Sequence, residues 1–373
     1  MKAAVLRQPN TPLAIEEVDL APPRTGEVKV RLAATGVCRS DHHVITGATK
    51  HPMPVVCGHE GAGWVAEVGP GVSRVKPGDP VVLSWAPFCG ACFYCDSGLP
   101  AQCEAYIKPV WAGTMIDGST RLSRAGQSLY HYSALASFAE ATVVPESCCV
   151  PVRGDVPLDA AALVGCAVAT GVGAAMYRAK VEPGSSVAVF GCGGVGINIV
   201  QGAALRGAET IIAIDKHSGR LELAGRFGAT RLVDSGIDDP VQAVRGLTGG
   251  RGADYTFEAI GNPAVMTQAI DAARRGGTIV LVGLGPHGTT FELGAGTFTR
   301  SDKVLTSAYY GGCVPQRDMP ALLDLYAEGR LKLDELIGRR RPLSEVNEAF
   351  ADLAAGDVIR TVIVFDQERA GPV

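Results

Sequence analysis

The stretch Ser186-Val187-Ala188-Val189-Phe190-Gly191-Cys192-Gly193-Gly194-Val195-Gly196 decides the fold of the second half of this 373-residue chain. Its first five residues predict a buried strand, and the glycines that follow have the spacing Gly-x-Gly-x-x-Gly. Residues 197–206 then predict a helix that ends at Gly207. This order of strand, glycine turn and helix is typical of a dinucleotide site, because a pyrophosphate can approach the helix N-terminus closely.

An acidic residue supports the same interpretation. Asp215 follows the next expected strand, where its carboxylate can accept hydrogen bonds from both ribose hydroxyls and repel a 2′-phosphate. We therefore expect NAD rather than NADP. Arg220 either reaches the adenosine ribose or is a solvated helix charge. The glycine turn is expected to contact the cofactor through Gly191, Gly193, Gly194, Val195 and Gly196.

The pattern of elements predicts a doubly wound parallel sheet in the second half of the chain. Its strands are expected at 186–190, 210–214, 231–233, 253–258, 278–282 and 304–307, with helices between them. The first 165 or so residues predict short β-segments with Gly/Pro turns, and the Ser/Gly-rich residues 113–137 predict a long loop or hairpin. After Tyr310 we expect helices at 320–328 and 345–354, then a strand at 360–365.

Four of the eleven cysteines lie close together, in the run Cys89-Gly-Ala-Cys92-Phe-Tyr-Cys95 and at Cys103. Such spacing favours a tetrahedral zinc held by four thiolates, which is a structural type of site. Two strained local disulfides, or four unrelated thiols, are the alternative. The odd total number of cysteines and the lack of export features favour the metal.

A second set of metal-ligating residues is dispersed along the sequence: Cys38, His59 and Cys166. Each lies beside glycines at the expected end of an extended segment. Two cysteines and one histidine would leave a zinc ion with an open fourth position, as a catalytic zinc needs. Spacing alone does not join the three, and a single buried cysteine is more often a small hydrophobic residue.

Composition limits the classes of partner. The net charge is −4 with no basic block, so nucleic acid is not expected as a partner. The start of the sequence is too soon interrupted by charge to be a signal peptide, and no apolar run approaches the ~20 residues of a membrane span. The richest run, from Val187, is broken by glycines. We expect a cytoplasmic protein with no membrane partner.

With these pieces assembled, the chain resembles the zinc-dependent medium-chain alcohol dehydrogenases over essentially its whole length. The resemblance rests on the four-cysteine run, the Gly-His-Glu and Gly-Cys-x-x-x-Thr-Gly motifs, the glycine fingerprint and Ile359-Arg360-Thr361. The stretch 113–118 resembles the liver-type, long-loop branch. The resemblance implies a chaperonin-10-like β-rich catalytic domain (1–167), a Rossmann domain (168–309) and a C-terminal return to the catalytic domain (310–373).

The resemblance also assigns roles to residues. It implies a catalytic zinc on Cys38, His59 and Cys166, a structural zinc on the four-cysteine run, and acids around the catalytic metal at Asp41 and Glu60. It places Arg39 and Arg360 beside the pyrophosphate, Thr170 and Val195 at the nicotinamide, and Val282 among the cofactor contacts. Ser40 and His43 would form a proton relay, although His42 adjoins His43 and only the family register chooses between them. The segment from Gly277 to Tyr310 resembles the one that pairs subunits, which implies a homodimer or tetramer.

The implied chemistry is oxidation of an alcohol to an aldehyde or ketone with hydride transfer to NAD. Two thiolates and a neutral imidazole cancel the charge of Zn²⁺, which remains a Lewis acid toward the alcohol. The proton would leave through Ser40, the cofactor ribose and His43, and the nicotinamide would carry the electrons.

Departures from the family pattern bear on the substrate. The glutathione-dependent formaldehyde dehydrogenases of this family use an Asp and an Arg where this chain has Thr49 and Ile107. Trp85, with Trp111 and Tyr310 nearby, indicates an apolar, aromatic pocket for a bulky, aromatic or allylic alcohol. Two alternatives remain: a thiol-dependent aldehyde dehydrogenase, and a non-catalytic dinucleotide-binding protein.

Overall fold

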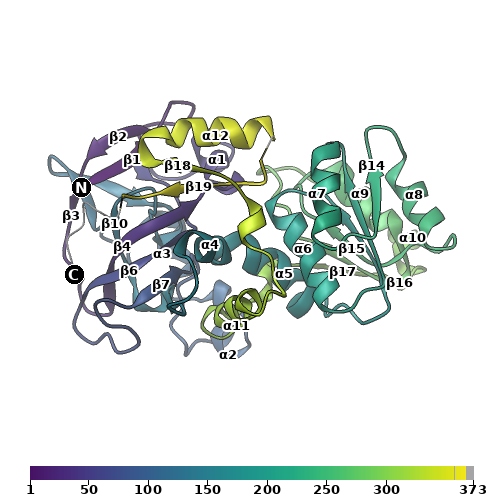
Figure 1. The fold of residues 1–373 in the computed structure, drawn as a ribbon, viewed down its shortest axis with the longest axis horizontal. Coiled ribbons are helices and arrows are strands. Elements are labelled where there is room, and N and C mark those ends of the chain that lie inside the picture. The colour runs from purple at the N-terminus through teal and green to yellow at the C-terminus, as the bar shows by residue number, and fades with distance from the viewer. Residues whose placement is uncertain (357, 367–373) are drawn as a thin grey trace. The chain divides into compact units, whose positions relative to one another are not determined.

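The computed structural model describes residues 1–356 and 358–366, which form two compact units. Unit 1 comprises Met1–Cys166 and the described residues from Val314 onward, and unit 2 comprises Ala167–Cys313. The expected boundaries, at 167/168 and 309/310, lie within a few residues of these divisions. Figure 1 shows the yellow C-terminal elements β18, β19 and α12 among the purple N-terminal strands, so the chain returns to unit 1.

Unit 1 is built on two β-sheets. One has the strand order β11-β7-β6-β4-β19-β18 with β10 also paired to β4, and the other has the order β2-β1-β5-β9-β8-β3. The strands are β1 (Lys2–Leu6), β2 (Ala14–Glu17), β3 (Asp19–Leu20), β4 (Glu27–Gly36), β5 (Val55–Val56), β6 (Gly61–Val68), β7 (Pro80–Leu83), β8 (Leu122–Arg124), β9 (Gln127–His131), β10 (Ala141–Pro145), β11 (Cys149–Pro151), β18 (Ile337–Pro342) and β19 (Arg360–Val364). Its helices are α1 (Arg39–Ile45), α2 (Phe93–Asp96), α3 (Ile107–Ala112), α4 (Leu158–Leu163), α11 (Pro315–Ala327) and α12 (Val346–Ala355).

Strand β4 organises the first sheet. Its apolar residues Val28, Val30 and Leu32 are buried, with two partly exposed residues between them, which is the period of a strand with one face in the core. It pairs antiparallel with β6, β10 and β19. The carboxyl end of β4 therefore leads directly to Cys38, and β5 leads directly to His59.

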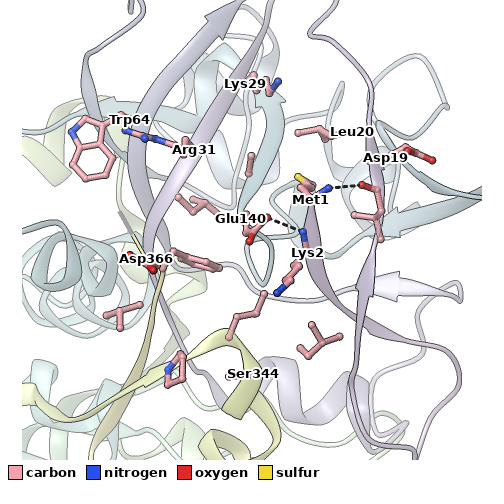
Figure 2. Close-up of a pocket in the computed structure, with 18 residues that line it drawn as sticks. Met1, Lys2, Asp19, Leu20, Lys29, Arg31, Trp64, Glu140, Ser344 and Asp366 are labelled. Atoms are coloured by element: carbon pink, nitrogen blue, oxygen red, sulfur yellow. Dashed lines mark hydrogen bonds between the residues drawn. The ribbon is translucent and has the colours of Figure 1, made fainter. Parts of the chain in front are cut away.

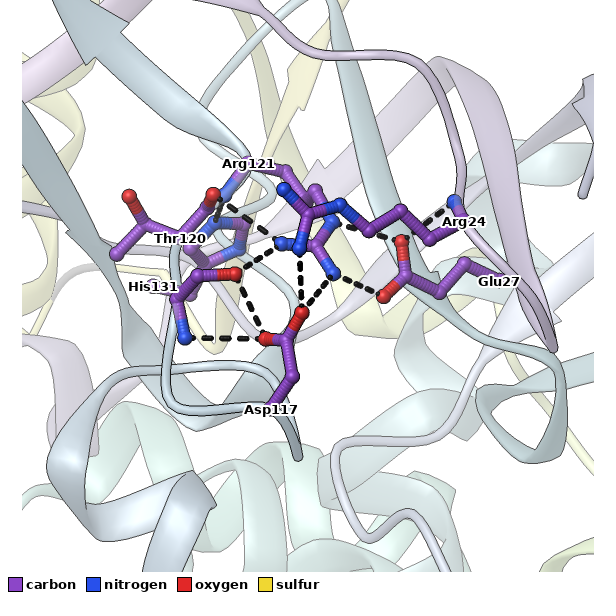
Figure 3. Close-up of polar contacts among 7 residues, drawn as sticks. Arg24, Glu27, Asp117, Thr120, Arg121 and His131 are labelled. Carbon is purple, nitrogen blue, oxygen red and sulfur yellow. Dashed lines mark hydrogen bonds and ion pairs between the residues drawn. The ribbon is translucent and has the colours of Figure 1, made fainter.

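The segment 113–137 is a hairpin of β8 and β9, as expected, and a buried ion network ties it to β4. Arg121 is 2% exposed, and its guanidinium donates to Glu27 Oε2 at 2.7 Å and to Asp117 Oδ2 at 3.0 Å (Figure 3). Arg24 donates to the same Asp117 oxygen at 2.7 Å. A buried charge is tolerated only when paired in this way, so the network fixes the hairpin that carries β9.

Unit 2 contains a parallel six-stranded sheet with the order β14-β13-β12-β15-β16-β17, which confirms the doubly wound fold. The strands are β12 (Ser186–Phe190), β13 (Thr210–Asp215), β14 (Arg231–Asp234), β15 (Ala253–Glu258), β16 (Ala273–Leu281) and β17 (Val304–Ser307). The helices are α5 (Ala169–Gly173), α6 (Gly194–Leu205), α7 (Ser218–Arg226), α8 (Pro240–Leu247), α9 (Pro263–Ala272) and α10 (Ala295–Thr299). Because the chain order reverses at β12, its carboxyl end and that of β15 form the topological switch point.

Two helices differ from expectation. Helix α11 begins at Pro315 rather than at residue 320, because a proline suits the first helical position and Asp318 accepts the Val314 N–H at 2.7 Å.

The expectation that no apolar run approaches about 20 residues is wrong. The helix Leu158–Arg178 is 21 residues long and apolar enough to cross a membrane, but 83% of its most apolar window is buried inside the protein. A buried core helix has the same properties, so this is weak evidence for a membrane span.

A cavity of about 720 Å³ opens in unit 1 between the N-terminal strands and β4 (Figure 2). Charged side chains of both signs line it, including Lys2, Lys29 and Arg31, and Asp19 and Glu140. Arg31 lies over the Trp64 ring at 5.2 Å. None of the residues predicted to form the functional site is among the described residues that line this cavity, so it is separate from that site.

Candidate active site

The dispersed ligand set comes together in unit 1. The ligand atoms of Cys38, His59, Glu60 and Cys166 all lie within 4.8 Å of one another, and all four residues are buried. Cys38 precedes α1, His59 follows β5, and Cys166 lies in the helix that continues from α4. The tertiary structure thus joins three ligands that spacing in the sequence left separate.

The donor set fits a divalent cation. A hydrogen bond from Cys166, and the charge of His59, lower the pKa of Cys38 well below its ordinary value despite burial. Burial alone would lower the pKa of His59, but the charges of Asp41 and Cys38 raise it well above its ordinary value. A site that stabilises a thiolate and draws a proton onto its imidazole carries negative charge that a metal ion would neutralise.

Asp41 fixes the orientation of His59. One carboxylate oxygen accepts the Gly58 N–H at 2.8 Å and lies 3.1 Å from His59 Nδ1. Since a carboxylate only accepts, Nδ1 carries the proton, and Nε2 is left as the metal-ligating nitrogen. Asp41 is fully buried at the start of α1, so its predicted place beside the metal ligands agrees with the geometry.

Glu60, whose carboxylate belongs to this cluster, forms a buried ion pair with Arg360. Burial raises the pKa of Glu60 to about 7, and the charge of Arg360 opposes that rise. Gly36 leaves the space for this carboxylate, since a Cβ there would lie 2.0 Å from Glu60 Oε2. Arg360 is only 4% exposed. Its predicted contact with a pyrophosphate therefore stays a prediction, while its pairing with Glu60 is a feature that the sequence did not reveal.

The expected relay residues lie on α1. The Ser40 hydroxyl is 3.8 Å from Cys38 Sγ. His42 and His43 are both half-buried, and burial, with the nearby charge of Arg39, lowers the pKa of each. The ring of His42 faces Phe350 at 6.3 Å, so it takes part in packing. Arg39 itself is exposed.

The four-cysteine run folds around α2. The sulfur atoms of Cys89, Cys92, Cys95 and Cys103 lie within 4.8 Å of one another. Cys89 is exposed, Cys92 and Cys95 are half-buried, and Cys103 is buried. Backbone N–H groups of Cys95 and Glu104 are the main cause that lowers the pKa of Cys92 to about 6. All eleven cysteines are free thiols in the structure. This geometry favours a metal over the disulfide alternative.

The glycine turn of unit 2 has the geometry of a dinucleotide site. Gly191 has φ +94°, and a Cβ at Gly196 would lie 1.7 Å from the Gly191 carbonyl oxygen. Gly193 precedes α6, whose N-terminus follows β12 directly. The first fingerprint glycine, Gly191, is thus required by its backbone conformation, and the last, Gly196, by the close approach of the Gly191 carbonyl.

Asp215 braces the same turn. Its carboxylate accepts the Cys192 N–H at 2.8 Å and the His217 N–H at 3.0 Å, and Arg220 lies 3.9 Å away. The structure therefore brings Asp215, Arg220 and the fingerprint together at the carboxyl ends of β12 and β13. Glu258 at the end of β15 was missed by sequence reasoning: it accepts N–H groups from Ile260 and Gly261 at 2.9 and 2.7 Å. An acid at the end of the strand next to the fingerprint was the available signal.

The remaining predicted residues are distributed as follows. In unit 2, Thr170 is 9% exposed on α5, Gly171 packs closely on the Val195 carbonyl, and Val282 donates its N–H to the Glu258 carbonyl. Tyr310 is 2% exposed in a turn with φ +53°. In unit 1, Trp85 is half-buried against the β-core, whereas Trp111 is 44% exposed on α3.

Comparisons with known proteins indicate the family of the chain. The family model described as Alcohol dehydrogenase GroES-like domain matches residues 24–154, and the one described as Zinc-binding dehydrogenase matches residues 194–328. An NDMA-dependent alcohol dehydrogenase of Amycolatopsis methanolica is 41% identical over 366 residues, covering 97% of this chain and 98% of that protein. The S-(hydroxymethyl)glutathione dehydrogenase of Saccharomyces cerevisiae is 39% identical over 374 residues, covering 98% and 96%. The crystal structure of benzyl alcohol dehydrogenase from Acinetobacter calcoaceticus has a TM-score of 0.93 and 32% identity, covering 98% of this chain and 99% of that one.

Proposed function

Because the chain belongs to the zinc-dependent medium-chain alcohol dehydrogenase family, we propose that it oxidises a bulky, aromatic or allylic alcohol with NAD. The product is the aldehyde or ketone. The observation that carries the proposal is the convergence of Cys38, His59 and Cys166 in one buried cluster whose charge suits a divalent cation. When bound, zinc supplies Lewis acidity toward the alcohol oxygen, and NAD supplies the hydride acceptor.

The protein groups hold the ligands and move the proton. Asp41 keeps His59 in the tautomer that presents Nε2. Ser40, beside Cys38, accepts the alcohol proton and passes its own proton toward His43 and water. Burial lowers the pKa of His43, so its imidazole is neutral and able to accept a proton at neutral pH.

The cofactor site completes the reaction. Asp215 is already held by two backbone N–H groups, and the ribose hydroxyls would donate to the same carboxylate. The N-terminus of α6, behind Gly193, offers unpaired N–H groups to the pyrophosphate. Thr170, Val195 and Val282 would contact the nicotinamide half, and Arg39 and Arg360 the pyrophosphate.

We propose two zinc ions per subunit with different tasks. The four sulfur atoms around α2 leave no open ligand position, so that zinc would be structural. The buried set has three family-type ligands and leaves a fourth position for the substrate. The eleven free thiols suit a reducing compartment, which supports a cytoplasmic location.

Two observations support an apolar alcohol. Thr49 and Ile107 stand where the resemblance places an Asp and an Arg, and neither carries a charge to pair with a thiol conjugate. Trp85 would offer a large aromatic wall. The likeness to benzyl alcohol dehydrogenase points the same way. Burial of apolar substrate surface is worth about 25 cal/mol per Å², so a small alcohol such as ethanol gains less from that wall.

The alternative is a glutathione-dependent aldehyde dehydrogenase, and relatives named S-(hydroxymethyl)glutathione dehydrogenase at 39–40% identity favour it. An NADH-formation assay separates the two. Benzyl and allylic alcohols are expected to outperform ethanol, whereas formaldehyde with glutathione is expected to give no more NADH than formaldehyde alone. A thiol requirement would reverse the order of the two candidates.

Trp85→Ala tests the pocket directly. We expect the substrate optimum to move toward bulkier alcohols and kcat/KM for benzyl alcohol to fall by about tenfold, the scale of 1–3 kcal/mol for pocket contacts. Trp64→Ala is the matched control, since Trp64 lies beside Arg31 at the separate cavity of unit 1 and belongs to no predicted pocket. Equal kcat/KM for ethanol and benzyl alcohol in the unmutated enzyme would refute the pocket and leave the zinc and NAD assignments intact.

A further inference from the structure

Tyr132 lies against two residues of the proposed site, although it belongs to no motif in the sequence. It follows β9 at the start of the turn η2 (Tyr132–Ala134) and is 5% exposed. It also packs in the apolar cluster that contains Val44 of α1 and Cys57. Its side chain therefore has little freedom to move.

The ring of Tyr132 meets the imidazole of His59 edge-on, with 5.5 Å between ring centroids and 84° between planes. This is the preferred geometry for a pair of aromatic rings. Asp41 holds His59 at Nδ1, and the tyrosine ring limits rotation of the same imidazole. Two independent contacts thus fix one metal ligand.

The hydroxyl of Tyr132 reaches α1. It donates to the carbonyl oxygen of Ser40 at 3.3 Å. A carbonyl can only accept, so the phenol must be the donor. The bond holds the backbone of the residue whose hydroxyl lies 3.8 Å from Cys38 Sγ. A phenylalanine at this position would keep the ring contact and lose only this bond.

The backbone after Tyr132 is strained. Three residues after it, Ser133, Ala134 and Ala136, have φ angles of 49°, 59° and 52°, which residues other than glycine rarely adopt. Such conformations are unfavourable and persist only where the surrounding structure enforces them. Here the next residues bind the loop before His59: Ser137 N–H donates to Gly58 at 2.9 Å and Phe138 N–H to Cys57 at 2.9 Å. The strained turn is thus attached to the loop that carries the ligand.

We propose that Tyr132 is a positioning residue that aligns the Ser40 relay with the His59 ligand, through its hydroxyl and its ring respectively. The inference rests on the proposed function, because it assumes that Ser40 transfers the alcohol proton. Loss of the hydroxyl should therefore slow proton transfer without releasing the metal. At high pH, hydroxide can take the proton directly, and the relay matters less.

The test compares Tyr132→Phe with Tyr130→Phe in the zinc-loaded, full-length enzyme. Tyr130 is a half-buried tyrosine two residues earlier, on β9, and serves as the matched control. We measure zinc content and kcat for benzyl alcohol from pH 6 to pH 10. For Tyr132→Phe we expect full zinc content and a loss in kcat of about fivefold near pH 7, the rate equivalent of one hydrogen bond. The loss should shrink toward pH 10, and Tyr130→Phe should match the unmutated enzyme.

Other results would overturn the inference. An unchanged kcat, or a loss that is equal at every pH, would show that the hydroxyl does not serve the relay. Loss of zinc or of the fold in Tyr132→Phe would show that the residue acts through packing. Ser40→Ala in the same assay separates a failure of the proposed relay from a failure of this inference. A normal rate in Ser40→Ala refutes the relay of the proposed function. A pH-dependent defect in Ser40→Ala, with none in Tyr132→Phe, refutes only the role of Tyr132.

Discussion

At the scale of single residues, the same side chain often has a task that the sequence indicates and another that only the fold reveals. The sequence predicts that Asp215 binds the ribose, and in the structure its carboxylate accepts the Cys192 N–H of the glycine turn. The family resemblance predicts that Arg360 contacts the pyrophosphate, and in the structure its guanidinium is paired with the buried Glu60. A substitution at such a residue therefore tests two functions together unless a second variant separates them.

Asp215→Gly should weaken the use of NAD and relatively improve the use of NADP, because the carboxylate that opposes a 2′-phosphate is removed. Part of the NAD loss will come from the lost bond to the turn. Asp215→Asn keeps one side-chain oxygen to accept the Cys192 N–H, but its amide nitrogen cannot accept the His217 N–H. It therefore removes the charge and one of the two bonds, and it should keep more of the NAD activity than Asp215→Gly. We expect the ratio of kcat/KM values for the two cofactors to change by about tenfold or more, on the scale of a buried polar contact. An unmutated enzyme that already prefers NADP would contradict the assignment.

His131 should make the stability of the protein depend on pH. It is fully buried and accepts the Arg121 N–H at 3.0 Å through Nε2. Burial, with the charge of Arg121, lowers its pKa to about 4, against an ordinary value of 6.5 for a histidine side chain. The folded protein keeps the neutral ring, so this stabilisation is present above pH 6.5 and is lost as the pH falls toward 4. The free energy involved is about 3 kcal/mol.

Urea unfolding at pH 7.5 and at pH 5 measures this dependence. His131→Gln retains an acceptor for the Arg121 N–H but does not titrate, so the difference in unfolding free energy between the two pH values should become smaller. His287→Gln is the control, because that histidine is exposed in unit 2. An identical pH dependence in all three proteins would show that His131 does not contribute.

At the scale of elements, the short segment around helix α2 has little buried apolar surface, so its order must come from its four cysteine ligands. Helix α2 has four residues and none of them is buried, and the two aromatic residues between Cys92 and Cys95, Phe93 and Tyr94, are exposed. Few apolar contacts are therefore available to order the segment from Cys89 to Cys103, called here the four-cysteine lobe. By contrast, β4 is held by three neighbouring strands.

Cys95→Ser should lower the zinc content from two ions per chain to one and reduce the thermal midpoint, because the metal provides the order that burial does not. His59→Ala should also lose one zinc but keep the lobe, and it should abolish turnover. Metal analysis and thermal unfolding of both variants distinguish these outcomes. A fully active unmutated protein with one zinc per chain would refute the two-site assignment.

At the scale of the whole molecule, the parallel sheet of unit 2 ends in an open edge. Among the described residues, strand β17 has a neighbouring strand, β16, on one side only, and Val304 on it is 53% exposed. Unpaired strand edges with apolar side chains invite association with another chain. The observation supports the predicted homodimer or tetramer.

Light scattering at micromolar concentration should give a mass of two or four times the 38.7 kDa chain. Val304→Lys places a charge on the edge strand and should shift the mass toward a single chain or weaken the assembly on dilution. Leu232→Lys is the control, since Leu232 is also exposed but lies on β14 at the opposite edge of the sheet. A stable single-chain mass for the unmutated protein would contradict the prediction.

Features that depend on local pattern could be predicted from the sequence. The strand and glycines at 186–196 predicted β12, the turn and α6, because a strand, a close backbone approach and a helix N-terminus each have a local signature. The four-cysteine run predicted its own cluster for the same reason. Which distant residues meet became clear from the folded chain. Cys38, His59 and Cys166 converge because the segments that follow β4 and β5 meet the helix that continues from α4. Tyr132 reaches Ser40 and His59 through a turn whose strain the fold maintains. Such contacts depend on long-range packing, which leaves no period or spacing in a single sequence.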